Sequence, residues 1–168
     1  MRLATIKIND GEYAGIVTDK GVVTIDTVNK VCGSSWQNQM YDMICSEEIP
    51  LLTKWYNQGG REELKKMDFI PHDQVVYGPL YRNPQRIFGI GLNYVDHAGD
   101  LGEGAPVGFP GSFYKPVSCI VGPGDNVCIP AMEEAKKTTG EAELGIIMGR
   151  KCKFIEEEDW EDYIVGYT

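Results

Sequence analysis

Hydrophobic and β-branched residues in the first 25 positions come in three short runs separated by turn residues. The runs cover residues 3–8, 13–18 and 22–25, and the turns are Asn9-Asp10-Gly11 and Asp19-Lys20-Gly21. Asp/Gly turns between β-branched runs are typical of antiparallel hairpins. The pattern therefore predicts a three-stranded meander.

The pattern becomes helical at Ser46, a candidate N-cap followed by two glutamates in the first turn. Ile49, Leu52 and Trp55 then share one face, and two glycines at 59–60 end the segment. A second short helix is expected over residues 61–67. Together these elements predict a small α+β domain over residues 1–75, followed by a linker at 76–83 that contains the turn residues Gly78, Pro79 and Asn83.

Short β-rich runs separated by Gly, Pro and Asp follow the linker. They cover residues 86–91, 117–121, 126–129 and 141–148, and an acidic stretch over 156–163 predicts a surface helix. We expect residues 84–168 to form part of a second, strand-rich domain.

Composition narrows the class of protein. The 168 residues are 42% hydrophobic and 24% charged, which is ordinary for a globular chain. The 25 acidic against 16 basic side chains give a net charge of −9, which argues against nucleic acid and anionic membranes as partners. No apolar run is long enough for a membrane span or resembles a secretion signal, so a cytoplasmic protein is expected, with a mitochondrial one left open.

The five cysteines are an odd number without a C-x-x-C pair, and only two histidines accompany them. Neither a zinc ribbon nor a disulfide framework fits this pattern. Buried, reduced thiols are therefore expected.

Glu141 and Glu143 are the first candidate for chemistry. In a strand over 141–148 both side chains would project from one face, and two like charges side by side are unfavourable unless a cation lies between them. Hard carboxylate oxygens select Mg²⁺, Mn²⁺ or Ca²⁺ over zinc. The alternative is a solvent-facing strand whose glutamates bind nothing.

His97 and Asp100 are the second candidate. If the chain turns into a helix after Asn93, they are i and i+3 neighbours, and the carboxylate can orient the imidazole as a general base toward water. A surface loop with polar side chains is the alternative. Lys115 follows two aromatic residues and either meets a substrate carboxylate or extends its ammonium into solvent as an ordinary surface lysine.

Five co-linear motifs together resemble the fumarylacetoacetate hydrolase superfamily. They are the run 84–94 leading into His97, Phe113-x-Lys115-Pro116, Val121-Gly122-Pro123-Gly124-Asp125, Glu141-x-Glu143-Leu144 and Val165-Gly166-Tyr167-Thr168. The resemblance covers residues 84–168, and residues 1–75 more loosely.

The resemblance implies an α+β fold, a mixed β-roll of the fumarylacetoacetate hydrolase type with a small N-terminal α+β domain, in a protein that is usually a homodimer. It also implies one divalent cation, Mg²⁺ or Mn²⁺, with Ca²⁺ as a possible occupant in a crystal. Glu141 and Glu143 would be metal ligands, and His97 the base that activates water. The family has glutamate at the position of Asp100, so Glu103 is the alternative partner of His97.

The implied function is hydrolysis of a C–C bond in a small 2-oxo or 1,3-dicarbonyl acid, such as an acylpyruvate, through a metal-stabilised enolate. Decarboxylation, isomerisation or tautomerisation on the same scaffold is the alternative, and a non-catalytic scaffold or binding protein is another. In relatives the third metal ligand and a catalytic lysine come from sequence beyond the position of Thr168. We therefore expect a truncated roll that a second polypeptide or a C-terminal remainder completes.

Overall fold

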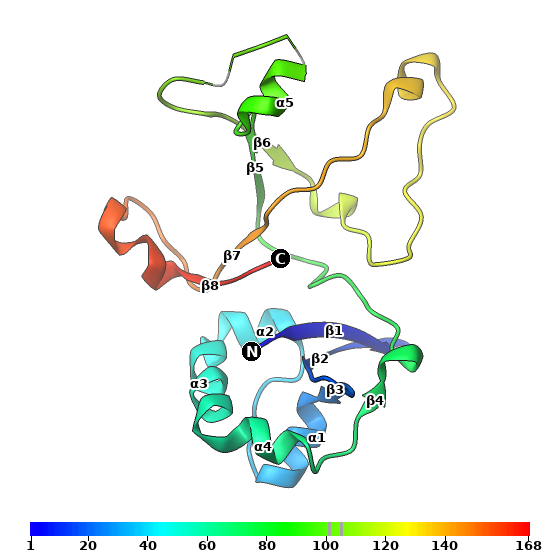
Figure 1. Cartoon of the computed structure of the whole chain (residues 1–168), viewed down its shortest axis with the longest axis vertical. Coiled ribbons are helices and arrows are strands. Elements are labelled where there is room, and N and C mark those ends of the chain that lie inside the picture. Colours follow the sequence, from blue (N-terminus) through cyan, green and yellow to red (C-terminus); the bar gives the residue numbers. More distant parts are fainter. Residues whose placement is uncertain (101, 105) are drawn as a thin grey trace. The chain divides into compact units, whose positions relative to one another are not determined.

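The first 24 residues form the predicted meander, which Figure 1 shows as β1 to β3. The structure is a computed structural model that describes residues 1–100, 102–104 and 106–168, and of residues 97, 100, 134 and 137 it describes the backbone alone. β1 and β2 pair antiparallel from Leu3↔Ile16 to Ile8↔Gly11, and β3 pairs with β2. Asn9, at the first hairpin turn, takes a positive φ of 52°, as a two-residue hairpin turn demands.

Helices and strands together give the α+β class that the sequence predicts. The strands are β1 (Leu3–Ile8), β2 (Gly11–Val17), β3 (Gly21–Thr24), β4 (Ile70–Pro71), β5 (Ile87–Gly91), β6 (Gly111–Lys115), β7 (Ile146–Met148) and β8 (Ile164–Tyr167). The α-helices are α1 (Ile25–Cys32), α2 (Met40–Cys45), α3 (Glu48–Trp55), α4 (Arg61–Leu64) and α5 (Val95–Asp100). The other helical segments are the π-helical η1 (Tyr56–Gly60) and the 3₁₀ segments η2 (His72–Gln74), η3 (Val117–Cys119), η4 (Glu133–Lys137) and η5 (Glu157–Tyr163). No helix among the described residues is long and apolar enough to cross a membrane.

These elements form two compact units. The first combines Met1–Tyr81 with Val121–Thr168, and the second is Arg82–Ile120. The division of the sequence into 1–75, 76–83 and 84–168 stays a prediction about independent domains.

The core of the first unit lies between one face of the meander and helices α1 to α4 (Figure 1). Ile16 and Val23 from the strands meet Val28, Met43 and Leu52 from the helices, and each of the five is at most 1% exposed. Complete burial of such a side chain contributes about 1.5–3 kcal/mol, so this layer is the main source of stability in residues 1–81.

Helix α1 is absent from the sequence-based prediction. Its first residue, Ile25, was expected at the end of a strand, but the strand ends at Thr24 because the Thr24 hydroxyl accepts a hydrogen bond from the Thr27 amide and caps the helix. Gly33, at φ 66°, ends it in the left-handed conformation.

The predicted N-cap at Ser46 is wrong. Ser46 is the C-cap of α2, and its amide donates to the carbonyl of Asp42. Glu47 follows with φ 55° and reverses the chain before α3 begins at Glu48. α2 and α3 are therefore two separate short helices, which contact each other.

The second face of the meander is also buried. Ile6 and Val22 lie on it, 1% and 0% exposed, outside the helix-facing core. The chain at 70–78 pairs with β3 and with β1. Its first part, β4, pairs with β3. Further along, the Lys7 amide of β1 donates to the Val76 carbonyl, and the Gly78 amide donates to the Thr5 carbonyl of β1. This segment therefore bonds to the backbone at both edges of the meander.

Residues 121–168 complete the first unit. β7 and β8 pair antiparallel, with a register shift between Ile147 and Met148, and Ile147 and Val165 pack against the core of residues 3–67. The predicted strand 126–129 is wrong, because the chain there has no regular structure and Val127 and Ile129 are exposed. The acidic run forms the expected surface helix as the 3₁₀ helix η5.

The second unit is a hairpin with a helix in its connection. β5 is the predicted strand, shortened to Ile87–Gly91, and pairs with β6, which the sequence analysis did not predict. Residues 117–121 are not the expected strand, since Val117–Cys119 form a single 3₁₀ turn.

All five cysteines, at positions 32, 45, 119, 128 and 152, are free, but they are exposed and not buried as expected. Cys32, for example, is the last residue of α1 and is exposed, although it is i+7 and i+4 from the buried Ile25 and Val28.

Candidate active site

Glu141 and Glu143 lie in an extended segment that leads into β7, and both are exposed. The predicted strand over 141–148 begins only at Ile146. Two backbone hydrogen bonds of 2.8 and 2.9 Å join Gly145 to Thr168 and extend the pairing of β7 with β8 to Gly145. The two carboxylates are thus placed just before a strand and not within it.

The carboxylate oxygens of Glu141 and Glu143 are suitable ligands for a hard divalent cation whose remaining ligands come from elsewhere. Mg²⁺ is commonly held by one or two carboxylates together with water and substrate oxygens. Within the described residues no group of three or more His, Cys, Asp and Glu side chains is close enough to hold a metal ion. Glu141 and Glu143 are therefore candidates for part of a ligand set.

His97 and Asp100 lie on α5, so the helix after Asn93 that their pairing requires is present. Their backbones are one turn apart as i and i+3 residues, while the positions of their side chains lie outside the described part of the structure. The Ala98 amide donates to the carbonyl of Tyr94, and the Ala98 carbonyl accepts from Glu103. Ala98 is buried, so the helix has an anchored side between these two positions.

Lys115 is the last residue of β6 and pairs with Ile87 of β5. Its side chain is exposed, and its Nζ lies 5.7 Å from the centroid of the Phe113 ring. This distance is within the range of a cation–π contact. Lys115 and α5 belong to the second unit, while Glu141 and Glu143 belong to the first.

Asp125 has a structural contact that the sequence analysis did not assign. One of its carboxylate oxygens accepts from the Gly122 amide at 2.7 Å, and the other lies 3.1 Å from the Lys7 ammonium on β1. The turn 122–125 is thereby attached to the meander. The G-P-G-D pattern signals the turn, but only the tertiary structure identifies Lys7 as the partner.

A cavity of about 610 Å³ lies within the first unit and is lined mainly by apolar side chains of β1, α2, α3, β7 and β8. Among the described residues that line it there is no Asp, Glu or His. The chemistry-bearing side chains of the unit lie elsewhere.

Comparison with known proteins identifies the family. Residues 86–168 match the family described as fumarylacetoacetate (FAA) hydrolase, C-terminal. The chain therefore belongs to the fumarylacetoacetate hydrolase superfamily, with the matched family domain in those residues. This confirms the resemblance based on the motifs between residues 84 and 168.

Two curated relatives illustrate the match. The mitochondrial oxaloacetate tautomerase of Xenopus laevis is 48% identical over 87 residues, which are 51% of this chain and 26% of that protein. An uncharacterized protein of Methanocaldococcus jannaschii is 41% identical over 85 residues, which are 51% of this chain and 35% of that protein.

Solved structures extend the similarity to almost the whole chain. A maleylpyruvate hydrolase from Sphingobium, crystallised with manganese(II) and pyruvate, matches 99% of this chain with a TM-score of 0.70 and 26% identity, and 56% of its own chain is covered. A protein described as a putative HpcE from Mycobacterium smegmatis matches 99% with a TM-score of 0.67 and 28% identity, and 53% of its chain is covered. The chain thus spans about half the length of these structures, and its N-terminal α+β part has a counterpart in both.

Proposed function

We propose that the protein is part of a divalent-metal-dependent hydrolase that cleaves a C–C bond in a small 2-oxo or 1,3-dicarbonyl acid. The observation that carries the proposal is the pair of exposed carboxylates, Glu141 and Glu143, inside the family-matched segment. The structural similarity to a maleylpyruvate hydrolase that was solved with manganese(II) and pyruvate supports it.

In this proposal Glu141 and Glu143 hold Mg²⁺ or Mn²⁺ through their carboxylate oxygens. The bound cation would polarise the oxygens of the oxo acid and stabilise the negative charge of the enolate that leaves. Both side chains are exposed and so are accessible to the metal and the substrate.

His97 is proposed to accept the proton of the attacking water, and Asp100 to orient the imidazole through the other ring nitrogen. The i, i+3 spacing on α5 suits that role. Because aspartate is one methylene shorter than glutamate, Glu103 remains the alternative partner. Lys115 is proposed to bind the substrate carboxylate through its ammonium.

The metal proposal is tested by titrating the protein with Mn²⁺ and following the electron paramagnetic resonance signal of free Mn²⁺. Glu141→Gln and Glu143→Gln should each weaken Mn²⁺ binding at least about tenfold. Even the mutation of a residue that only hydrogen-bonds a metal ligand lowers metal affinity about 10–100-fold. Glu133→Gln is the matched control, because it removes the same charge from an exposed glutamate whose contact is with Lys136. Equal affinity in all three variants would contradict the assignment.

A second candidate function is keto–enol tautomerisation of oxaloacetate. The 48% identity to an oxaloacetate tautomerase over 87 residues supports it. Tautomerisation needs proton transfer and enolate stabilisation but no attack by water.

An assay with Mg²⁺ or Mn²⁺ separates the candidates. C–C hydrolysis predicts loss of the acylpyruvate chromophore with one pyruvate released per turnover, whereas tautomerisation predicts accelerated interconversion of oxaloacetate without a change in its total amount. Release of CO₂ would indicate a decarboxylase, and metal binding without turnover of either substrate would favour a scaffold. The homodimer, the completing polypeptide and the cellular compartment stay predictions.

A further inference from the structure

The two faces of the β5–β6 hairpin carry different aromatic arrangements. On one face Phe88 and Tyr114 are directly paired, with ring centroids 5.2 Å apart and an interplanar angle of 73°. On the other face Phe113 is paired with Gly89, and Lys115 follows two residues later. The candidate substrate-binding lysine thus shares its face with one aromatic ring and one glycine.

Gly89 makes room for the Phe113 ring. A Cβ atom at position 89 would lie 2.5 Å from Cζ of Phe113, far inside van der Waals contact. The ring therefore lies across the backbone of the neighbouring strand and is not directed into solvent. Phe113 is 41% exposed in this position, compared with 65% for Tyr114.

The Lys115 ammonium lies beside this ring, 5.7 Å from its centroid. A cation–π contact attracts the charged form of the amine without using any of its three N–H donors. A lysine that is held in this way can still donate to a carboxylate, and it loses less side-chain freedom when it binds one.

We propose that Phe113, placed across Gly89, is a positioning residue that holds the Lys115 ammonium ready for the carboxylate of a small oxo acid. The proposal rests on the proposed function, in which Lys115 binds that carboxylate. The competing explanation is that Phe113 only covers Gly89 and stabilises the hairpin, as an aromatic ring opposite a glycine often does.

The first experiment measures the contact without any substrate. The rate at which an amine-acylating reagent labels Lys115 is followed by peptide mass spectrometry in the wild type and in Phe113→Leu. The free energy of a cation–π contact at an exposed site corresponds to about a 2–5-fold change in an equilibrium constant. The labelling rate of Lys115 should therefore rise by about that factor when the contact is lost. Phe113→Tyr keeps the ring and should restore the wild-type rate.

Tyr114→Leu is the matched control, because it removes an aromatic ring from the opposite face of the same strand. A purely structural role predicts that Phe113→Leu and Tyr114→Leu loosen the hairpin and accelerate labelling alike. Equal rates in these two variants, or an unchanged rate in Phe113→Leu, would overturn the proposal.

The second experiment measures pyruvate affinity in the presence of saturating Mn²⁺ by calorimetry. Phe113→Leu should weaken binding about 2–5-fold, Lys115→Met should weaken it at least as much, and Tyr114→Leu should leave it unchanged. A wild-type protein that binds Mn²⁺ but no pyruvate would overturn the substrate role of Lys115. A protein that binds no Mn²⁺ would instead contradict the proposed metal site, while the labelling result still decides whether Phe113 holds Lys115.

Discussion

The N-terminal residues 1–81 and the residues after them differ sharply in how they bury apolar side chains. Among the residues whose side chains the structure describes, fourteen of the fifteen buried hydrophobic ones lie between Ile6 and Met67, and the remaining one is Ala98. In the later region large apolar side chains such as Val107, Phe109 and Phe154 are almost fully exposed. The earlier region therefore carries its own core, while the region with every candidate site residue does not.

This difference separates the residues that stabilise the chain from those that are candidates for its chemistry. A core side chain is held by many neighbours, whereas Glu141, Glu143 and Lys115 are exposed. Site residues are commonly placed on exposed segments that a stable scaffold supports. The connections between the two regions, such as the one through Asp125, then acquire functional importance.

The largest expected effect is in the core of residues 1–81. Leu52→Ala removes a fully buried side chain from α3 and should lower the free energy of unfolding by about 2–5 kcal/mol, measured by urea denaturation. Leu51→Ala, at the neighbouring position that is 56% exposed, should change it by less than about 0.5 kcal/mol. Similar losses in both variants would show that the buried layer is not the main source of stability.

A smaller effect is expected at Phe154 in the later region. This residue has φ 54° and is 90% exposed, so its conformation costs energy that its burial does not recover. Phe154→Asn should stabilise the loop by about 0.5–1 kcal/mol, because asparagine tolerates the left-handed region better.

The measurement for Phe154 is hydrogen exchange at the Gly149 amide, which donates to the Tyr163 carbonyl and closes this loop. Protection should rise about 2–5-fold, the equivalent of that energy. Phe109→Asn is the control, since Phe109 is fully exposed and is not among the residues with a positive φ. Unchanged protection at Gly149 would contradict the idea that Phe154 strains the loop.

The ion pair between Lys7 and Asp125, which links the two regions, should contribute less to stability than the two preceding changes. Lys7 and Asp125 are partly exposed, at 29% and 34%, so their ion pair is expected to contribute about 0.2–1 kcal/mol. A double-mutant cycle with Lys7→Met and Asp125→Asn, followed by thermal unfolding, gives this coupling directly. Strictly additive effects would mean that Asp125 attaches its turn through the Gly122 amide and not through Lys7.

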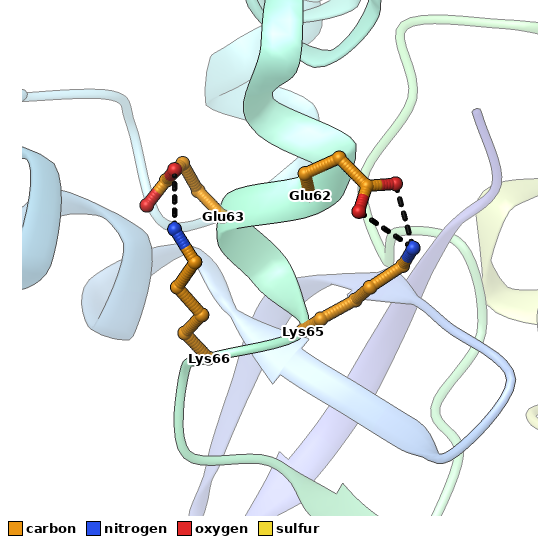
Figure 2. A network of polar contacts seen from close by, with 4 residues as sticks. All are labelled: Glu62, Glu63, Lys65 and Lys66. Atoms are coloured by element: carbon orange, nitrogen blue, oxygen red, sulfur yellow. Dashed lines mark hydrogen bonds and ion pairs between the residues drawn. The ribbon is translucent and has the colours of Figure 1, made fainter.

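The smallest effect concerns two ion pairs at the C-terminal end of α4, Glu62 with Lys65 and Glu63 with Lys66, which Figure 2 shows. The hydrogen bond and the charge of Lys65 hold the pKa of the Glu62 carboxyl below its ordinary value. The pKa of Glu62 is thus lower in the folded state than in the unfolded state. The ion pair therefore stabilises the fold fully at a pH above the unfolded-state pKa. This contribution is lost as the pH falls through the folded-state pKa.

An NMR titration of the Glu62 side chain tests this assignment. Lys65→Met should return the pKa of Glu62 toward its ordinary value, whereas Lys66→Met should change it little, because Lys66 pairs with Glu63 (Figure 2). The reverse order of effects would contradict the pairing.

Local sequence signals were sufficient for several elements. The Asn9-Asp10-Gly11 turn between alternating apolar residues predicted the β1–β2 hairpin, because turn chemistry and strand pattern act over a few residues. The family was also identified from the motifs over residues 84–168. Site residues could be named because their side-chain chemistry and spacing are properties of the sequence itself.

Other features depended on contacts between distant residues. The apolar run 126–129 is not a strand, because a strand forms only where a second strand offers its backbone groups, and Phe113 became part of β6 because β5 lies beside it. β7 begins at Ile146, so Glu141 and Glu143 precede it. The sequence by itself determined which side chains are candidates for the chemistry, while only the tertiary structure decided that Lys7 meets Asp125 and that Phe113 lies opposite Gly89, because residues far apart in the chain make contacts that no local pattern encodes.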